Sequence, residues 1–457
     1  MSKITTDELR RAIESNEITT VVCAATDLWG RLVGKRLTGK TFLETAIDSE
    51  GLHGSLYLFT VSMEMWPQPG YEVTSFDTGL NDFQFVPDLD TIRVTPWVER
   101  TAIVICDPCY EGTDKPLEMA PRNILKREIA KAAKHGITTK FASELEFFLF
   151  QDSYEEAWDK GYRDLNPTSR YNADYHILQS TKIEPIIQQI RDGMDAAGIE
   201  IEFSKVEWGF GQQEINLKYA DTLEMADRHM LYKHGVKEIA ALNGMSASFM
   251  AKLWKEEIGS SCHLHASLWD ETGKKALCWD ESRPGYISEQ FGHFMGGLLG
   301  TARELTWLYA PTVNSYKRFE PLSFAPVQIV LGDDNRSCGF RLCGERESFR
   351  VENRIPGADV NPYLGIAATL AAGTYGVENQ LPVPEIYHGN AYEDETLPKV
   401  AMTLYEAIAE FGKSTLAKEM LGDMAYNHLL NFARVEQASF DNEVVTDWER
   451  KRYFERI

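Results

Sequence analysis

The feature that most constrains the fold is a strand-like segment, residues 140–150 (KFASELEFFLF), with two acids on one face of an apolar strand. Alternate side chains of a strand point to opposite faces, so Glu144 and Glu146 lie side by side, roughly 6.6 to 7 Å apart. A solvated sheet face would show the same alternation, but Phe148 shares the face of the two acids. Buried carboxylates need a counter-charge. We therefore expect an interior site on this strand.

Three further segments repeat the pattern of ionisable side chains opposite apolar ones. They are residues 206–217 with Glu207 and Glu214 on either side of a glycine-containing turn, residues 260–269 with His263, His265 and Ser267, and residues 348–356 with Arg350, Glu352 and Arg354. Taken singly, the glutamate pair is a weak signal, and the histidines are equally typical of a protein surface. Four such segments together predict strands that converge on one polar interior.

Five glutamates and one histidine form a ligand set suited to hard divalent cations. Carboxylate oxygen prefers Mg²⁺ or Mn²⁺, and this set disfavours zinc. The arginines among the acids indicate an anionic ligand that bridges the metals, which is typical of phosphoryl transfer. The chain has neither a G-x-x-x-x-G-K-[ST] loop nor a kinase-type glycine loop. A nucleotide must therefore be held in another way.

Length and charge restrict the class of protein. A formal charge of −22 on 457 residues argues against nucleic-acid binding, because an acidic surface repels phosphate backbones. This length exceeds a single compact core of about 250 to 300 residues and predicts at least two domains. Short strands and turns precede residues 110–118 (YEGTDKPLE), and helical periodicity follows them. We expect an N-terminal β-rich domain over residues 17–112 and a second domain over residues 113–457.

The sequence shows no targeting or membrane feature. The first 17 residues are polar and charged, with no apolar segment, and no stretch reads as a membrane span. Seven cysteines, an odd number, argue for a reducing compartment rather than a disulfide framework. Cys106 and Cys109 form a C-x-x-C after a strand-like run, and we interpret them as structural thiols. These features predict a cytoplasmic protein.

Three helices are predicted after the boundary, over residues 119–136, 184–198 and 223–244. The first has Pro121 at an early helical position and is terminated by Gly136, and the last ends at Gly244. The polar-faced strands lie between and after these helices. The expected class is α+β.

These segments resemble sequence blocks of the glutamine synthetase superfamily, in the family's order. The matching blocks are ASELEFFLF, GQQEINLKYADTLEMADRHMLYK, GSSCHLHASL, APVQIVLGDDNRSCGFRL and FRVENRIPGADVNPYLGIAA, which cover most of residues 119–372, and NDFQFVPDLDT nearer the N-terminus. The resemblance implies a β-grasp N-terminal domain and an α/β catalytic domain with a funnel of antiparallel strands. It also implies a homo-oligomer, a dodecamer of two hexameric rings or a related ring assembly.

The resemblance implies roles for individual residues. Glu146, Glu207 and Glu214 match the ligands of a first divalent ion, and Glu144, His263 and Glu352 match those of a second, beside the phosphates of ATP; two to three Mg²⁺ or Mn²⁺ ions are implied. Gly259, Arg318, Arg354 and Glu207 match glutamate-binding positions, His265, Ser267, Arg336 and Arg341 match ATP-binding positions, and Arg336, Arg318 and Asp82 match catalytic positions. For each arginine, a salt bridge to a neighbouring acid stays an alternative.

The sequence departs from the members of the family that use ammonia. Those enzymes carry a flap glutamate that closes the site and helps to take a proton from ammonium, whereas this flap, RFEPLSFAP, has Phe324 at that position. Glu320, four residues upstream, is no simple substitute. Ile258 replaces the usual asparagine, and Asp82 matches one ammonium-pocket acid whose companion is not recognisable. These changes give the amine pocket of Phe324, Ile258 and Asp82 more apolar surface.

We therefore interpret the chain as a glutamate-amine ligase, resembling γ-glutamylamide and γ-glutamylpolyamine synthetases. Such an enzyme uses ATP to phosphorylate the side-chain carboxylate of L-glutamate, and an organic primary amine then displaces phosphate, in amine use or detoxification. The missing second acid favours a monoamine over a polyamine. Three alternatives stay open: a glutamine synthetase that uses ammonia, a non-catalytic assembly protein of this fold, and hydrolysis or transfer to another acceptor.

Overall fold

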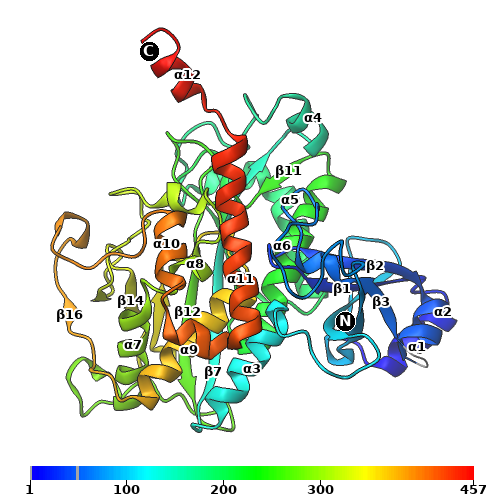
Figure 1. Ribbon diagram of the computed structural model, residues 1–457, viewed down its shortest axis with the longest axis horizontal. Helices are drawn as coiled ribbons and strands as arrows, with labels where there is room; N and C mark the ends of the chain where they lie inside the picture. The colour runs from blue at the N-terminus through cyan, green and yellow to red at the C-terminus, as the bar shows by residue number, and fades with distance from the viewer. Residues whose placement is uncertain (1–2, 48–50, 457) are drawn as a thin grey trace.

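The computed structural model describes residues 3–47 and 51–456, arranged as two sheet-containing parts side by side (Figure 1). The N-terminal part has a six-stranded sheet of order β2-β1-β6-β4-β3, with β5 paired to β6. Its helices and strands are α1 (Thr6–Glu14), β1 (Thr20–Thr26), β2 (Leu32–Thr38), α2 (Gly39–Phe42), β3 (Leu52–Ser55), β4 (Asp82–Pro87), β5 (Arg93–Val94) and β6 (Thr101–Tyr110). β1 and β6 pair in parallel, and the other pairs are antiparallel.

The connection between the two parts follows β6. The expected domain limits, 17–112 and 113–457, stay predictions; α1 lies before residue 17, and its Leu9 is fully buried in the hydrophobic core. The two parts are joined by Arg122, whose guanidinium lies 2.8 Å from Asp88 and 2.5 Å from Asp107 in the N-terminal part, and 2.9 Å from Asp227 in the second part. This buried network fixes the N-terminal sheet against the larger part.

The larger part is built on a ten-stranded sheet of order β16-β13-β14-β15-β12-β7-β9-β8, with β10 and β11 also paired to β7. The first half of its chain contains α3 (Pro121–Ala133), β7 (Thr138–Phe150), α4 (Tyr154–Asp159), α5 (Ile177–Ala196), β8 (Ile201–Val206), β9 (Gln212–Leu217), β10 (Ala220–Asp221), α6 (Thr222–Leu242), β11 (Ser246–Ser248) and β12 (Cys262–Trp269). The second half contains α7 (Glu289–Thr301), α8 (Thr306–Tyr309), β13 (Leu331–Asp333), β14 (Phe340–Cys343), β15 (Arg350–Asn353), α9 (Pro362–Glu378), β16 (Ile386–Tyr387), α10 (Leu404–Phe411), α11 (Thr415–Glu443) and α12 (Asp447–Tyr453).

The larger sheet is not wholly antiparallel, in contrast to the expected funnel of antiparallel strands. β13 runs parallel to both of its neighbours, β14 and β16. The strands that bear the predicted ligands, β7, β9, β12 and β15, pair antiparallel, as expected. The departure is therefore confined to one edge of the sheet.

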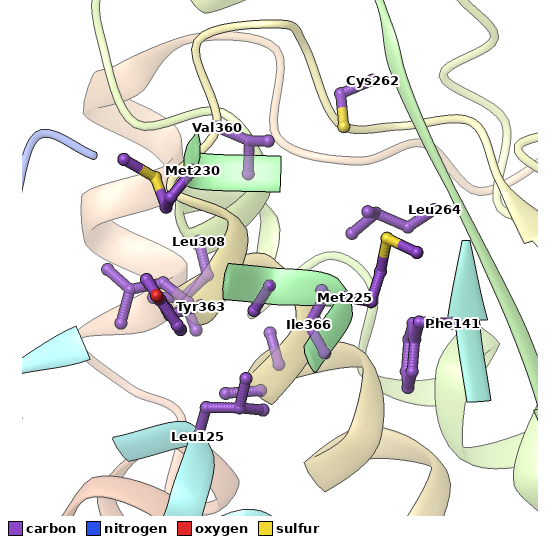
Figure 2. Packing of buried hydrophobic residues seen from close by; sticks show 14 of the residues in the cluster. Leu125, Phe141, Met225, Met230, Cys262, Leu264, Leu308, Val360, Tyr363 and Ile366 are labelled. Atoms are coloured by element: carbon purple, nitrogen blue, oxygen red, sulfur yellow. The ribbon is translucent and has the colours of Figure 1, made fainter. Parts of the chain in front are cut away.

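The core lies between the sheet and the helices that cover one face of it. Figure 2 shows Phe141 of β7 and Leu264 of β12 beside Met225 of α6, with Leu125 of α3 and Ile366 of α9 in the same cluster. The apolar side chains of β7 on this face are fully buried. Burial of each large one contributes about 1.5–3 kcal/mol to the stability of the fold. Because apolar side chains face the helices, the alternate residues of β7 must face the other way.

The sequence predicted two of the three helices within a few residues. α3 begins with Pro121 at its first turn, and Gly136 beyond its end has a φ of 68°. α6 ends before Gly244, which has the same φ. α5 begins at Ile177, seven residues before the predicted start at 184, and contains Pro185 within it. The predicted start places Pro185 in the first turn of the helix, whereas the helix begins two turns earlier and continues through this proline.

The cysteines agree with the expectation of structural thiols. All seven cysteines are free thiols, including Cys106 and Cys109 on β6, which are both buried. In residues 3–47 and 51–456, every helix is too short or too polar to cross a membrane. The last helix, α12, projects from the body of the molecule (Figure 1).

Candidate active site

Strand β7 positions two clusters of ionisable side chains because it lies between β12 and β9. Its register with β12 sets Glu144 opposite His263, and its register with β9 sets Glu146 opposite Glu214. Glu144 and Glu146 are two residues apart, so both point to the face opposite the core. The resulting groups are Glu144, His263 and Glu352, and Glu146, Glu207 and Glu214, with potential ligand atoms in each group within 4.8 Å of one another. The structure thus brings together the two predicted ligand sets.

The group around Glu146 is buried and crowded with negative charge. Glu146 accepts a hydrogen bond from the backbone N–H of Ser261 at 2.7 Å. Burial, and then the charge of Glu207, raises the pKa of Glu146 to about 8. Burial and the hydrogen bond with Glu207 raise the pKa of Glu214 to about 10. Lys205 contacts Glu207 and lies 3.9 Å from Glu214, so its ammonium offsets part of this charge.

The group around Glu352 is balanced by cations instead. One carboxylate oxygen of Glu352 lies 2.5 Å from Arg354, and the other lies 2.9 Å from Arg341. His263 Nδ1 lies 3.0 Å from Glu144 and 3.3 Å from Glu352. Burial acts to raise the pKa of Glu352, but the surrounding cations, Arg354 foremost, outweigh it and lower that pKa to about 2. This carboxylate is therefore charged at neutral pH.

Both groups fit a divalent cation. In the first group, Glu146 and Glu214 bind protons more tightly than ordinary carboxyls do, because their charges are buried and lie close to Glu207. A cation bound between them would offset both the buried charge and the repulsion. In the second group, His263 Nε2 is buried and has no hydrogen-bond partner in the described part of the chain, so its lone pair is available to a metal. Carboxylate-rich ligand sets with at most one imidazole suit Mg²⁺ or Mn²⁺.

The two groups open into one cavity of about 310 Å³. Besides the six potential ligands, its wall contains six other predicted residues: Ile258, Gly259, Phe324, Arg336, Arg341 and Arg354. Arg341 and Arg354 are paired with Glu352, so the alternative of a salt bridge holds for these two arginines. Arg336 lies exposed between β13 and β14, and no carboxylate of the described residues lies within ion-pair distance of it. Arg336 is therefore available to an anionic ligand.

The flap residues 319–325 place an aromatic side chain at the cavity mouth. Phe324 and Leu322 have φ values of 58° and 60°, which non-glycine residues rarely adopt. The ring of Phe324 lies 5.9 Å from that of Trp208, and the two residues are 49% and 46% exposed. Glu320 lies 2.8 Å from Lys252 and does not line the cavity. The mouth thus presents aromatic surface at the flap position where the ammonia-using enzymes carry an acid.

A second cavity, of about 190 Å³, adjoins the first and shares Glu144 and Asn216 with it. His265 and Ser267, two of the residues predicted to bind ATP, line this second cavity. His265 Nε2 lies 3.0 Å from Glu144, which ties the two cavities together. The other two predicted residues, Arg336 and Arg341, line the first cavity. The four are therefore divided between two connected spaces.

Aromatic and basic side chains line the rest of this second cavity. The rings of Trp269 and Tyr219 stack at 6.2 Å, and Lys140 Nζ lies 4.6 Å from the centre of the Trp269 ring. Arg350 donates a hydrogen bond to His265 Nδ1 at 3.1 Å. A flat aromatic surface beside cations is suited to a nucleobase and its phosphates.

Two predicted residues lie outside both cavities. Arg318 is buried, and its guanidinium donates hydrogen bonds to backbone carbonyls of residues 354–356 at 2.8–3.3 Å. A Cβ at Gly259 would lie 2.6 Å from the Arg318 side chain, so only glycine permits this packing. Asp82 begins β4 and is exposed on the N-terminal sheet. Arg318 thus supports the cavity wall from behind, and Asp82 lines neither cavity in the single chain.

Sequence reasoning missed several residues of the two cavities. Lys205 lies 3.3 Å from Asp174 and 4.3 Å from the centre of the Tyr175 ring. Its position two residues before Glu207 repeats the alternating pattern, which was a usable signal. Asp174 and Tyr175 belong to the connection between α4 and α5, where no periodicity marks them. Trp208, in the turn between β8 and β9, is likewise marked by no periodicity.

Comparison with known proteins agrees with this geometry. The chain matches the glutamine synthetase catalytic domain over residues 118–453. It is 44% identical over 451 residues to a γ-glutamylethanolamide synthetase of Streptomyces coelicolor, covering 99% of this chain and 96% of the relative. It is 37% identical over 454 residues to a glutamate–isopropylamine ligase of Pseudomonas sp., covering 98% of each.

A solved structure extends the similarity to three dimensions. The structure of a GmaS–ADP complex superimposes with a TM-score of 0.85 at 27% identity, covering 98% of this chain and 100% of that one. The catalytic-domain match spans all the strands of the larger sheet. This protein therefore belongs to the glutamine synthetase family.

Proposed function

We propose that this protein is an ATP-dependent ligase that joins the γ-carboxylate of L-glutamate to an organic primary amine, releasing ADP and phosphate. The observation that supports this most directly is the aromatic mouth of Phe324 and Trp208 beside two intact ligand groups. The relatives named as synthetases of γ-glutamylethanolamide and of a glutamate–isopropylamine product act on small organic amines. The aromatic mouth and the two relatives favour an amine with a carbon substituent.

The two ligand groups would hold two to three Mg²⁺ or Mn²⁺ ions, Glu146, Glu207 and Glu214 on the glutamate side and Glu144, His263 and Glu352 on the ATP side. Bound there, the ions neutralise charge on glutamate and on the phosphates. The adenine of ATP lies against Trp269 and Tyr219 in the second cavity, near His265 and Ser267. Glu144 borders both cavities, so the terminal phosphate of ATP points toward the glutamate.

The first chemical step makes the glutamate side chain electrophilic. A carboxylate resists nucleophiles because of its charge and resonance, so the γ-phosphate of ATP is transferred to it to give an acyl phosphate. Arg336 and Arg341 lie in the cavity wall where charge builds up in this transfer, and fixed cations in a partly dry site are effective there. Gly259 and Arg354 hold the amino-acid end of glutamate, and Arg318 holds the segment after Arg354 in place.

The second step is attack by the amine. An apolar substituent gains about 0.8 kcal/mol for each methylene buried against Phe324, Trp208 and Ile258. The missing second acid, the unrecognised companion of Asp82, favours a monoamine over a polyamine. Asp82 contributes to the amine pocket only if the N-terminal sheet of a second copy reaches the cavity, which a ring of subunits, hexameric or double-hexameric, would achieve. We further propose that the N-terminal sheet is a β-grasp domain and that the enzyme is cytoplasmic.

The alternatives are less well supported. A glutamine synthetase that uses ammonia needs a proton acceptor at the flap, and Phe324 cannot serve. A non-catalytic assembly protein should have lost ligands, whereas all six are present and grouped. Hydrolysis would leave the aromatic mouth of Phe324 and Trp208 without a role in the reaction.

Phosphate release with saturating ATP and glutamate, measured across ammonia, ethanolamine, isopropylamine and putrescine, tests the proposal. We expect the highest kcat/KM with a monoamine and a product mass equal to that of its γ-glutamylamide. If ammonia gives a higher kcat/KM than every organic amine, the proposal is wrong. Transfer of labelled oxygen from the glutamate carboxylate to phosphate tests the acyl phosphate separately.

A further inference from the structure

A cavity of about 740 Å³, larger than both active-site cavities, contains none of the residues proposed to act in the reaction. It lies between the two parts of the molecule. Trp29, Arg31 and Met63 line it from the N-terminal part, and α6, the loop after β11 and α11 line it from the larger part. Its volume falls in the range of about 300–1,000 Å³ that is typical of sites for small molecules.

One wall of this cavity holds a buried, unpaired cation. Lys233, on α6, is 9% exposed, and no carboxylate of the described residues lies within ion-pair distance of its ammonium. Its ammonium lies 5.8 Å from the centre of the Phe249 ring. Burial, and then the neighbouring Lys237, lowers the pKa of Lys233 to about 8. Burying an ammonium without a partner is unfavourable, and an anionic group in the cavity would pair with it.

Acids on other elements border the same cavity and are incompletely satisfied. Asp359, between β15 and α9, accepts hydrogen bonds from Thr312 and Ser315 through Oδ2, while its buried Oδ1 has no partner among the described residues. Glu436, on α11, forms no ion pair in the described part of the chain, and burial raises its pKa. The cavity therefore offers places for both an anion and a cation.

Apolar side chains line the space that the charged groups leave. Trp29, Met230, Phe249 and Leu253 belong to this lining. An occupant of matching chemistry has a carboxylate, an ammonium and a hydrocarbon portion. An inorganic anion would leave Asp359 without a partner and the apolar surface uncovered. A simple amine would leave Lys233 unpaired.

The wall of this cavity is continuous with the wall of the active site. Asn314 lines the cavity and is hydrogen-bonded to both the backbone N–H and the carbonyl of Lys252, at 2.9 and 2.7 Å. The Lys252 ammonium donates to the carbonyl of Glu257 at 2.6 Å and to the flap residue Glu320 at 2.8 Å. The same loop ends at Ile258, in the wall of the active-site cavity.

We propose that this interdomain cavity binds a free amino acid with a hydrocarbon side chain, and that its occupation changes the amine step through Lys252 and the flap. Lys233 binds the carboxylate, and Asp359 with Glu436 binds the ammonium. The hydrocarbon side chain packs against Phe249 and Met230. Binding is independent of the proposed ligase reaction, whereas the effect on the amine step rests on that proposed function, so the two proposals can fail separately.

Isothermal titration calorimetry on the full-length protein, saturated with glutamate, ADP and Mg²⁺, tests the binding. The probes are leucine, methionine and phenylalanine, with 4-methylpentanoate as a probe that lacks the ammonium. We expect at least one amino acid to bind, and Lys233→Met to weaken it at least tenfold, as expected for the loss of a charge-assisted hydrogen bond. Asp359→Asn should weaken the binding of the amino acid more than the binding of 4-methylpentanoate.

Lys413→Met, at an exposed lysine outside the cavity, is the matched control and should bind like the wild type. Thermal unfolding verifies that Lys233→Met is folded, and we expect no loss of stability because the variant removes an unpaired buried charge. The site is refuted if none of the three amino acids binds, or if Lys233→Met binds them as tightly as the wild type. The coupling is refuted if a bound amino acid changes neither kcat nor the KM for the amine.

Discussion

Replacing Phe324 with glutamate should shift the enzyme from organic amines toward ammonia. The variant removes one of the two aromatic rings at the cavity mouth and adds a carboxylate where the amine enters. Phe324 is 49% exposed, so no core packing is lost, and its positive φ is equally strained for either side chain. The substitution therefore tests recognition of the amine rather than folding.

The expected size follows from the contacts at the mouth. An ethyl group buried between Phe324 and Trp208 gains about 1.6 kcal/mol, and removing one ring forfeits about half, or about 0.8 kcal/mol, which is about fourfold in kcat/KM. A carboxylate at a half-exposed position adds about 0.2–1 kcal/mol to the binding of ammonium, up to about fivefold. The ratio of ammonia use to ethylamine use should therefore rise by about 5- to 20-fold.

Initial rates of phosphate release at varied ammonia and ethylamine concentrations measure this ratio. Phe324→Gln is the control, because glutamine has the size of glutamate without its charge, and it should show only the fourfold loss with ethylamine. Equal ratios for Phe324→Glu and Phe324→Gln would show that charge at the flap has no part in amine choice. An unchanged ratio in both would place the amine elsewhere.

Three further results are expected. Glu352→Gln should abolish one Mn²⁺ site in calorimetric stoichiometry and lower kcat by about 100-fold or more, because it removes a potential ligand and the partner of two arginines; unchanged stoichiometry would contradict the assignment. Trp269→Ala should raise the KM for ATP about fivefold or more without changing that for glutamate, because base stacking is worth about 1–3 kcal/mol; equal changes in both would argue against a nucleotide there. The pKa values of Glu146 (about 8) and Glu214 (about 10) lie above the value of 4.5 in the unfolded chain, so the two groups stabilise the folded metal-free protein at a pH below 4.5. This stabilisation is lost as the pH rises through 8 and 10. The gain in Tm on adding Mn²⁺ should therefore grow between about pH 6 and pH 9, and a gain independent of pH would refute this origin.

Much of the fold could be predicted because local patterns agreed with the tertiary structure. The alternation in residues 140–150 gave β7 within two residues, and Pro121 and Gly136 marked the limits of α3. The early start of α5 and the parallel pairing of β13 had no comparable local signal. Both depend on packing against segments distant in sequence.

The active-site residues divide in the same way. The alternation from Lys205 to Glu207 indicated that Lys205 shares a face with the acids. Trp208 is next to Glu207, yet only folding shows that its ring lies beside Phe324. Arg318 was expected in the glutamate site because of its motif, and the structure places it behind Gly259. A motif specifies which residue is present, but the backbone path decides what its side chain reaches.

The sequence by itself determined which side chains are available for metal and phosphate chemistry, since strand alternation puts Glu144 and Glu146 on one face. Only the tertiary structure decided how they divide, because β7 pairs with β12 on one side and β9 on the other. That pairing gives Glu144 a histidine and Glu146 a second glutamate as neighbours. Register between distant strands is fixed by the packing of the whole sheet on its helices, and no single segment contains that information.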